Sequence, residues 1–127
     1  MAMGTSSRGG SAWTLLAAER FSESFRAFQP AEMIRTLQLE KGKLVKHYMT
    51  ELLQAERLVV GCEGGEDFLE VAIEYFGCAP FMYSSDFPHE VDVESCKHEL
   101  DELSELKISD KAKDRLRGGT ARTFYRI

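Results

Sequence analysis

The sequence lacks the features that several protein classes require. It has only three cysteines and three prolines, and no pair of cysteines stands in a Cys-x-x-Cys spacing. An odd number of scattered cysteines fits reduced thiols better than a disulfide framework or a zinc knuckle. No apolar run approaches the roughly 18–20 residues of a membrane span. The small, polar residues 1–11 lack the apolar core of a secretory signal. These absences predict a cytoplasmic protein without a membrane segment.

Basic charge is also scarce. The chain has 16 basic and 21 acidic residues and a net charge of -5, which argues against a nucleic-acid-binding protein that needs a basic face. With 43% hydrophobic and 29% charged residues, the composition is ordinary for a globular protein. A chain of 127 residues is long enough for one core. We expect a flexible, Gly- and Ser-rich lead-in at residues 1–10 and one domain over residues 11–127.

The first half of the chain is predicted to be helical. Apolar residues recur at helical spacing over residues 12–28, Pro30 suits the start of a short helix at residues 31–39, and another helix follows at residues 44–55. The residues expected to face the core are Trp13, Leu16, Ala17, Phe21, Phe25 and Phe28 in the first helix and Leu44, Tyr48, Leu52 and Ala55 in the third.

The second half alternates strands and helices. The apolar run at residues 57–62 shows no alternation, which is typical of a strand buried on both faces of a parallel sheet. A helix at residues 66–76, a strand at residues 80–84 and a helix that Asp92 caps come next, and Ser109 caps a last helix that ends at a Gly-Gly pair. Strand–helix–strand connections make parallel neighbours. The sequence therefore predicts a helix-rich α/β class with parallel strands. The residues expected to face inward from the two long helices are Phe68, Leu69, Ala72, Ile73, Phe76, Val93, Cys96, Leu100, Leu103 and Leu106.

Two carboxylates follow the two predicted strands. Glu63 comes directly after the first strand and Asp86 comes just after the second. Parallel strands end at the same edge of a sheet, and ligands bind at that edge in parallel α/β folds. We therefore take Asp86 and Glu63 as candidate site residues, although acidic residues are also common in loops. Glu66, Asp67 and Glu70 are expected to favour the start of the helix at residues 66–76 through the helix dipole.

Four segments carry a resemblance to a known family. They are the run Ser-Asp-Phe-Pro-His-Glu at residues 85–90, the strand at residues 57–63, the element at residues 121–125, and Trp13 together with residues 19–24. In this order and spacing they resemble the metal-dependent amidohydrolase family, in the branch that contains aminocarboxymuconate-semialdehyde decarboxylase. The resemblance covers nearly the whole chain.

The resemblance implies a fold and a chemistry. The family folds as a (β/α)8 TIM barrel of about 250 residues, and this chain corresponds to its C-terminal part, strands seven and eight with their flanking helices. The implied reaction is hydrolysis of a C–N or C–C bond, or decarboxylation, of a small-molecule substrate with a divalent metal, zinc above all. Asp86 is then the metal-proximal carboxylate and base, His89 a second catalytic residue, and Glu63 a substrate-binding residue.

The sequence departs from the family in its histidines. It contains only His47, His89 and His98, with no His-x-His pair, whereas a catalytic zinc site takes three protein ligands. We therefore expect the isolated chain to bind metal weakly and to be inactive. Asp86 and His89 could instead only shape their loop, and Glu63 could be a solvated or helix-capping residue. The alternative function is a non-catalytic α/β interaction or structural protein. Open strand edges predict self-association or a complementing barrel half as the partner.

Overall fold

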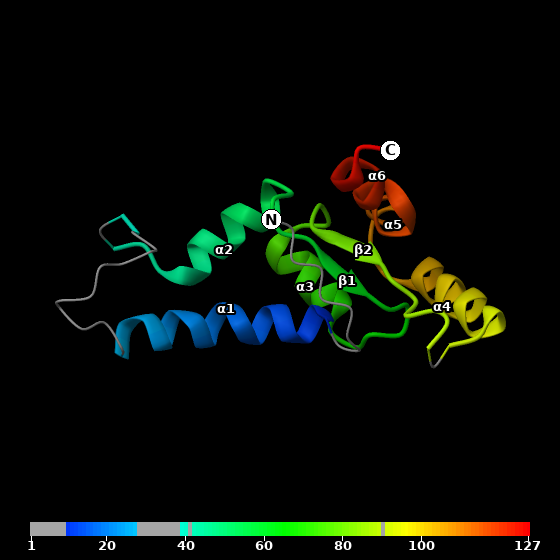
Figure 1. Cartoon of the computed structure of the whole chain (residues 1–127), viewed down its shortest axis with the longest axis horizontal. Coiled ribbons are helices and arrows are strands. Elements are labelled where there is room, and N and C mark those ends of the chain that lie inside the picture. The colour runs from blue at the N-terminus through cyan, green and yellow to red at the C-terminus, as the bar shows by residue number, and fades with distance from the viewer. Residues whose placement is uncertain (1–9, 28–38, 41, 90) are drawn as a thin grey trace.

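Helices surround a small two-stranded sheet (Figure 1). The computed structural model describes residues 10–27, 39–40, 42–89 and 91–127. Nearly all of the predicted lead-in and of the helix predicted at residues 31–39 lies outside the described residues. In chain order the elements are α1 (Gly10–Ala27), α2 (Val45–Gln54), β1 (Val60–Cys62), α3 (Leu69–Phe76), β2 (Phe81–Tyr83), α4 (Val93–Glu105), α5 (Asp110–Asp114), the kinked segment η1 (Arg115–Gly119) and α6 (Thr120–Tyr125).

The two strands pair in parallel, joined by α3. Val60 lies opposite Phe81 and Cys62 lies opposite Tyr83. The predicted parallel pair and the coarse α/β class are thereby confirmed, although both strands are shorter than predicted. All three residues of β1 are buried, as expected from an apolar run that does not alternate with polar residues.

The start of α1 covers the free edge of β1. Val60 donates its N–H to the carbonyl of Pro80 and Cys62 accepts from the N–H of Ser84, both at 2.9 Å, so these groups face β2. In a strand ladder the intervening Gly61 then faces the opposite edge. A Cβ atom on Gly10 would lie 2.2 Å from the carbonyl oxygen of Gly61. Only glycine at position 10 therefore allows the helix to approach the strand so closely.

Helix α1 is confirmed, but its predicted buried face is only partly right: Ala17 is buried and Phe25 packs against the core, and Phe28 lies outside the described residues. Trp13, Leu16 and Phe21 are 50%, 58% and 47% exposed. Thr14 and Ser22 are buried because their hydroxyls donate to carbonyls one turn earlier in the same helix, at 2.7 and 2.9 Å. Small side chains on this face bring α1 close to its neighbours. The buried residues of α1 are Gly10, Ser11, Thr14, Ala17, Ala18 and Ser22.

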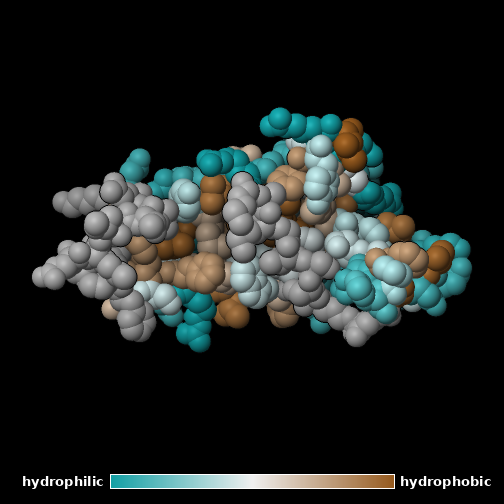
Figure 2. Space-filling view, viewed as in Figure 1, coloured by the Kyte–Doolittle hydropathy of each residue, from teal (hydrophilic) through white to brown (hydrophobic). Residues whose placement is uncertain are grey.

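Helix α2 is also confirmed, with its buried face one residue away from the predicted one. Val45, Met49 and Leu53 are buried instead of the stripe that begins at Leu44. The N–H of Lys46 donates to the hydroxyl of Ser22 at 2.9 Å, which fixes the first turn of α2 against α1. Figure 2 shows apolar residues gathered between α1 and α2.

Helix α3 begins three residues later than predicted. Leu69, Ala72 and Phe76 are fully buried, whereas Phe68, predicted to face inward, is 55% exposed. The helix ends at Gly77, as predicted. Glu66 precedes α3 and so does not lie in its first turn, which removes the dipole role assigned to it.

The last helices begin where their caps predict. The N–H of Ser95 donates to the Asp92 carboxylate at 2.8 Å, and the N–H of Ala112 donates to the Ser109 hydroxyl at 3.2 Å. Leu103 is buried but Val93 is exposed, contrary to prediction. The last predicted helix ends at the Gly-Gly pair, as predicted, because the backbone at Gly118 is not helical, and α6 follows as a separate helix. Within the described residues, every helix is too short or too polar to cross a lipid bilayer.

Candidate functional site at the carboxyl edge of the sheet

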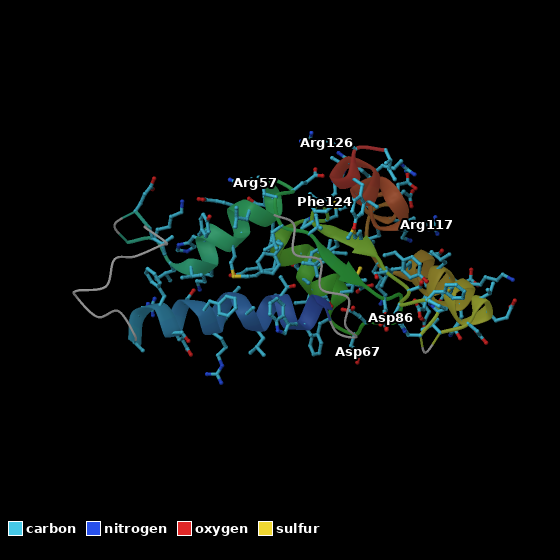
Figure 3. All side chains as sticks on the ribbon, in the orientation of Figure 1. Arg57, Asp67, Asp86, Arg117, Phe124 and Arg126 are labelled. Carbon is cyan, nitrogen blue, oxygen red and sulfur yellow. The ribbon has the colours of Figure 1, made fainter. Side chains whose placement is uncertain are left out.

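The carboxyl ends of β1 and β2 carry the predicted acidic residues. Because the strands are parallel, the segment that begins at Glu63 and the loop that holds Asp86 leave the sheet at the same edge. Figure 3 shows Asp86 beyond the end of β2. Asp86 is exposed and has a φ of 57°, a left-handed conformation that Asp adopts more readily than most residues. The predicted placement at a common edge is thus met for these two segments.

Backbone bonds organise the loop after β2. The N–H of His89 donates to the carbonyl of Asp86 at 3.1 Å, and the N–H of Phe87 donates to the hydroxyl of Ser85 at 3.3 Å. These bonds close a tight turn with Asp86 and His89 exposed at its surface. The turn thus presents a carboxylate and an imidazole three residues apart.

Glu66 connects the carboxyl edge of the sheet to α1. Its carboxylate accepts the N–H of Glu63 at 3.1 Å and the N–H of Ser11 at 2.9 Å, and the Ser11 hydroxyl also donates to it. The N–H of Ser11 belongs to the first turn of α1, where helix geometry leaves donors without partners. A carboxylate there also favours the helix dipole. Glu66 therefore caps α1 from a distant part of the chain and fixes the backbone at Glu63.

An acidic cavity of about 410 Å³ lies between this segment and α4. A Cβ atom on Gly64 would lie 2.0 Å from the carbonyl oxygen of Glu99, so the absence of a side chain at residue 64 lets the segment touch α4. The contact brings carboxylates from α4 beside those that follow β1. The cavity is lined by Ser11, Ala12, Glu63, Gly65, Glu66, Asp67, Phe68, Glu99 and Glu102.

Tyr83 joins the end of β2 to α4. Its hydroxyl donates to the carbonyl of Cys96 at 3.3 Å. Burial raises the pKa of Tyr83, and the nearby carboxylate of Glu99 raises it further. The phenol therefore keeps its proton at neutral pH and can act there as a hydrogen-bond donor.

The Cys62 thiol is buried and held protonated. Burial raises its pKa, and the carboxylates of Glu66 and Glu63 add to this effect. Its Sγ donates to the carbonyl of Met82 at 3.4 Å. All three cysteines are free thiols, and Cys62 behaves as a small core residue because the thiolate, the reactive form, is disfavoured.

The described residues do not by themselves assemble a zinc site. Among them, no group of three or more His, Cys, Asp and Glu side chains is placed to hold one metal ion. His47, His89 and His98 are all exposed. Asp86 and His89 can supply at most part of the three protein ligands of a catalytic zinc site.

Sequence reasoning missed the partners that packing supplies. Glu99 and Glu102 lie more than thirty residues from Glu63 along the chain, and the packing of α4, with its close contact at Gly64, brings them together. Within this cavity, the one contact that local spacing could predict is between Glu63 and Glu66, which are three residues apart. Comparison of the chain with protein-family models, with curated proteins and with solved structures found no match.

Proposed function

We propose that this chain forms the C-terminal part of a metal-dependent amidohydrolase-type enzyme. The reaction is hydrolysis of a C–N or C–C bond, or decarboxylation, of a small molecule. One observation carries the proposal: Glu63 and Asp86 follow two adjacent parallel strands at their common carboxyl edge. Active sites of (β/α)8 enzymes are built from this edge. The resemblance of residues 85–90 to the family's eighth strand supplies the reaction class.

The position of α1 bears on how a barrel could be completed. By resemblance α1 is the helix that follows strand six, and strand six would pair with β1 at the edge that β2 leaves open. Gly10, the first residue of α1, lies against Gly61 at that edge. The start of α1 would therefore have to move aside before strand six could pair with β1.

Asp86 is proposed as the base of the reaction. Its carboxylate is exposed at the edge where substrates bind in this architecture, and a carboxylate in such a place can take a proton from an attacking water molecule. His89 shares the turn and is proposed to orient Asp86 or to donate a proton. The family's divalent metal would activate the water, and its remaining ligands would have to come from strands one to five, on the same polypeptide or on another.

Metal analysis tests the first part of this proposal. The purified chain is dialysed against zinc and its metal content is measured. We expect well below one equivalent of zinc, because the described residues hold no group of three ligands. One tightly held equivalent would show that this chain completes a zinc site alone, which contradicts the division of ligands proposed here.

Complementation tests the second part. The chain is expressed together with strands one to six of an amidohydrolase of known activity that lacks its own last two strands. We expect zinc binding and hydrolysis to appear only when both pieces are present. A stable complex that binds zinc but has no activity would contradict the catalytic role of Asp86.

A second candidate function rests on α1. Its exposed Trp13, Leu16 and Phe21 are the kind of side chains that bury at protein interfaces. A non-catalytic interaction protein derived from the barrel would form a complex without restoring hydrolysis. The complementation experiment therefore distinguishes the two functions.

A further inference from the structure

Charge is sorted along the chain. Residues 63–105 contain thirteen acidic residues and one basic residue, Lys97, a net charge of -12. Residues 106–127 contain seven basic and two acidic residues, a net charge of +5. The overall charge of -5 therefore hides two regions of strong and opposite sign.

The acidic region forms a defined surface between α3 and α4. Asp67, Glu70, Glu102 and Glu105, named here the acidic surface, line a hollow of about 300 Å³ together with the apolar side chain of Leu106. Asp67 and Glu105 are exposed. Glu102 lies 3.6 Å from the exposed imidazole of His98, and Glu70 accepts the N–H of Lys107 at 2.6 Å. No lysine or arginine side chain forms an ion pair with these four carboxylates in the described part of the chain.

The basic region forms a second surface around α6. Arg57, Arg122, Tyr125 and Arg126, named here the basic surface, are all exposed. An ion pair of 2.7 Å between Glu56 and Arg115 ties the turn that carries Arg57 to the last helices. Among the described residues, none of the three arginines of the basic surface forms an ion pair with a carboxylate. Arginine and tyrosine are enriched at the centres of protein interfaces.

The two surfaces face different sides of the molecule. Figure 3 shows Arg57 and Arg126 on one side and Asp67 on the other, with the sheet between them. The residues that precede the strands lie near the basic surface, because Arg115 and Thr120 both donate to the carbonyl of Ala79 just before β2. The residues that follow β1 lie near the acidic surface. Lys113 and Arg117 reach Ser104 of α4, next to Glu105, but the three arginines of the basic surface are too far away to neutralise the acidic surface of their own copy.

We propose that copies of this chain associate head to tail, with the basic surface of one copy on the acidic surface of the next. The partner is a second copy of this chain, because each copy carries the acidic surface on one side and the complementary basic surface on another. In this arrangement Tyr125 packs into the hollow beside Leu106 while Arg57, Arg122 and Arg126 meet the surrounding carboxylates. Such a heterologous contact builds short filaments or a closed ring rather than a two-fold dimer. The inference does not depend on the proposed function.

Sedimentation at two salt concentrations is the first test. Because exposed charges are screened by salt, association should be strong at about 50 mM salt and at least tenfold weaker at about 300 mM salt. A chain that stays monomeric at low salt, or associates equally at both concentrations, overturns the proposal.

Charge reversal is the decisive test. The variants are Arg57→Glu/Arg122→Glu on the basic surface and Glu102→Lys/Glu105→Lys on the acidic surface. Each variant alone places like charges at the contact and should be monomeric, while an equimolar mixture restores opposite charges and should associate. Glu23→Lys, on the exposed side of α1, is the matched control and should associate like the parent chain.

Circular dichroism establishes that each variant is folded. If a reversed variant unfolds, Arg57→Gln/Arg122→Gln and Glu102→Gln/Glu105→Gln replace the pair, and each should weaken association at least tenfold. Association that survives all charge changes but is lost in Trp13→Glu/Leu16→Glu would assign the contact to the apolar side of α1 and overturn the proposal.

Discussion

At the scale of single residues, Glu66 differs most from what its position suggests. A carboxylate just before an apolar helical stretch is usually taken to favour that helix. Here α3 begins at Leu69, and Glu66 is free to accept from Ser11 at the start of α1. Local spacing cannot reveal this role, because the partner lies 55 residues earlier in the chain.

Replacing Glu66 should loosen the junction of α1 and the sheet. Hydrogen bonds to a charged group contribute about 1.5–3 kcal/mol each to stability, and exposure reduces that figure, so Glu66→Ala should lower the free energy of unfolding by about 2 kcal/mol. Glu66→Gln keeps a hydrogen-bond acceptor, so it should lower the free energy of unfolding by less than Glu66→Ala. The measurement is urea denaturation, with Asp67→Asn as control. Equal stability of Glu66→Ala and the parent chain would contradict the capping role.

The stability should fall at alkaline pH. Burial raises the pKa of both Tyr83 and Cys62 in the folded chain above their ordinary values of 10.0 and 9.0. The unfolded chain therefore loses these protons first, and the free energy of unfolding decreases as the pH rises above about 9. Urea denaturation at pH 7 and pH 10.5 measures the decrease. In Tyr83→Phe the free energy of unfolding should fall less between pH 7 and pH 10.5 than in the parent chain. An equal fall in both proteins would exclude Tyr83 as a cause.

At the scale of elements, the sequence predicts which segments form strands and helices better than it predicts their faces. The parallel strands, α1, α2 and the caps at Asp92 and Ser109 follow from local patterns and are confirmed. The buried face of α1 does not follow, because buried Thr14 and Ser22 satisfy their hydroxyls within the helix. A prediction that buries the large apolar side chains of α1 and exposes its hydroxyl side chains therefore misplaces part of the buried face of the helix. The barrel context remains a prediction.

Two adjacent glycines test the contact between the segment after β1 and α4. A Cβ at Gly64 would lie 2.0 Å from the Glu99 carbonyl oxygen, which is backbone and cannot move aside. A Cβ at Gly65 would meet only the end of the Glu102 side chain, at 3.0 Å. We expect Gly64→Ala to destabilise the chain by about 3 kcal/mol or more, as overpacking does, and Gly65→Ala to cost much less. Thermal unfolding of both variants measures the difference, and equal melting temperatures would refute this packing.

At the scale of the whole molecule, the sequence predicts where the candidate site lies but does not predict all the side chains that line it. Parallel strand order is enough to bring Glu63 and Asp86 to one edge. Glu99 and Glu102 of α4 line a cavity with Glu63 but not with Asp86, and they reach it through packing of α4 that includes the close contact at Gly64. Under the proposed function the remaining metal ligands would come from strands one to five of the barrel, and no pattern within residues 1–127 can place them.

In the proposed function, Asp86 serves as the base at the carboxyl edge of a completed amidohydrolase-type barrel. The most direct measurement is the hydrolysis rate of the complemented complex with Asp86→Asn, compared with His98→Ala as the control, at equal zinc content and equal complex formation. An amide cannot accept the proton, so Asp86→Asn should slow hydrolysis by about 10²–10⁴-fold, while His98→Ala, on the exposed side of α4, should leave the rate nearly unchanged. Full activity of the Asp86→Asn complex would contradict the claim.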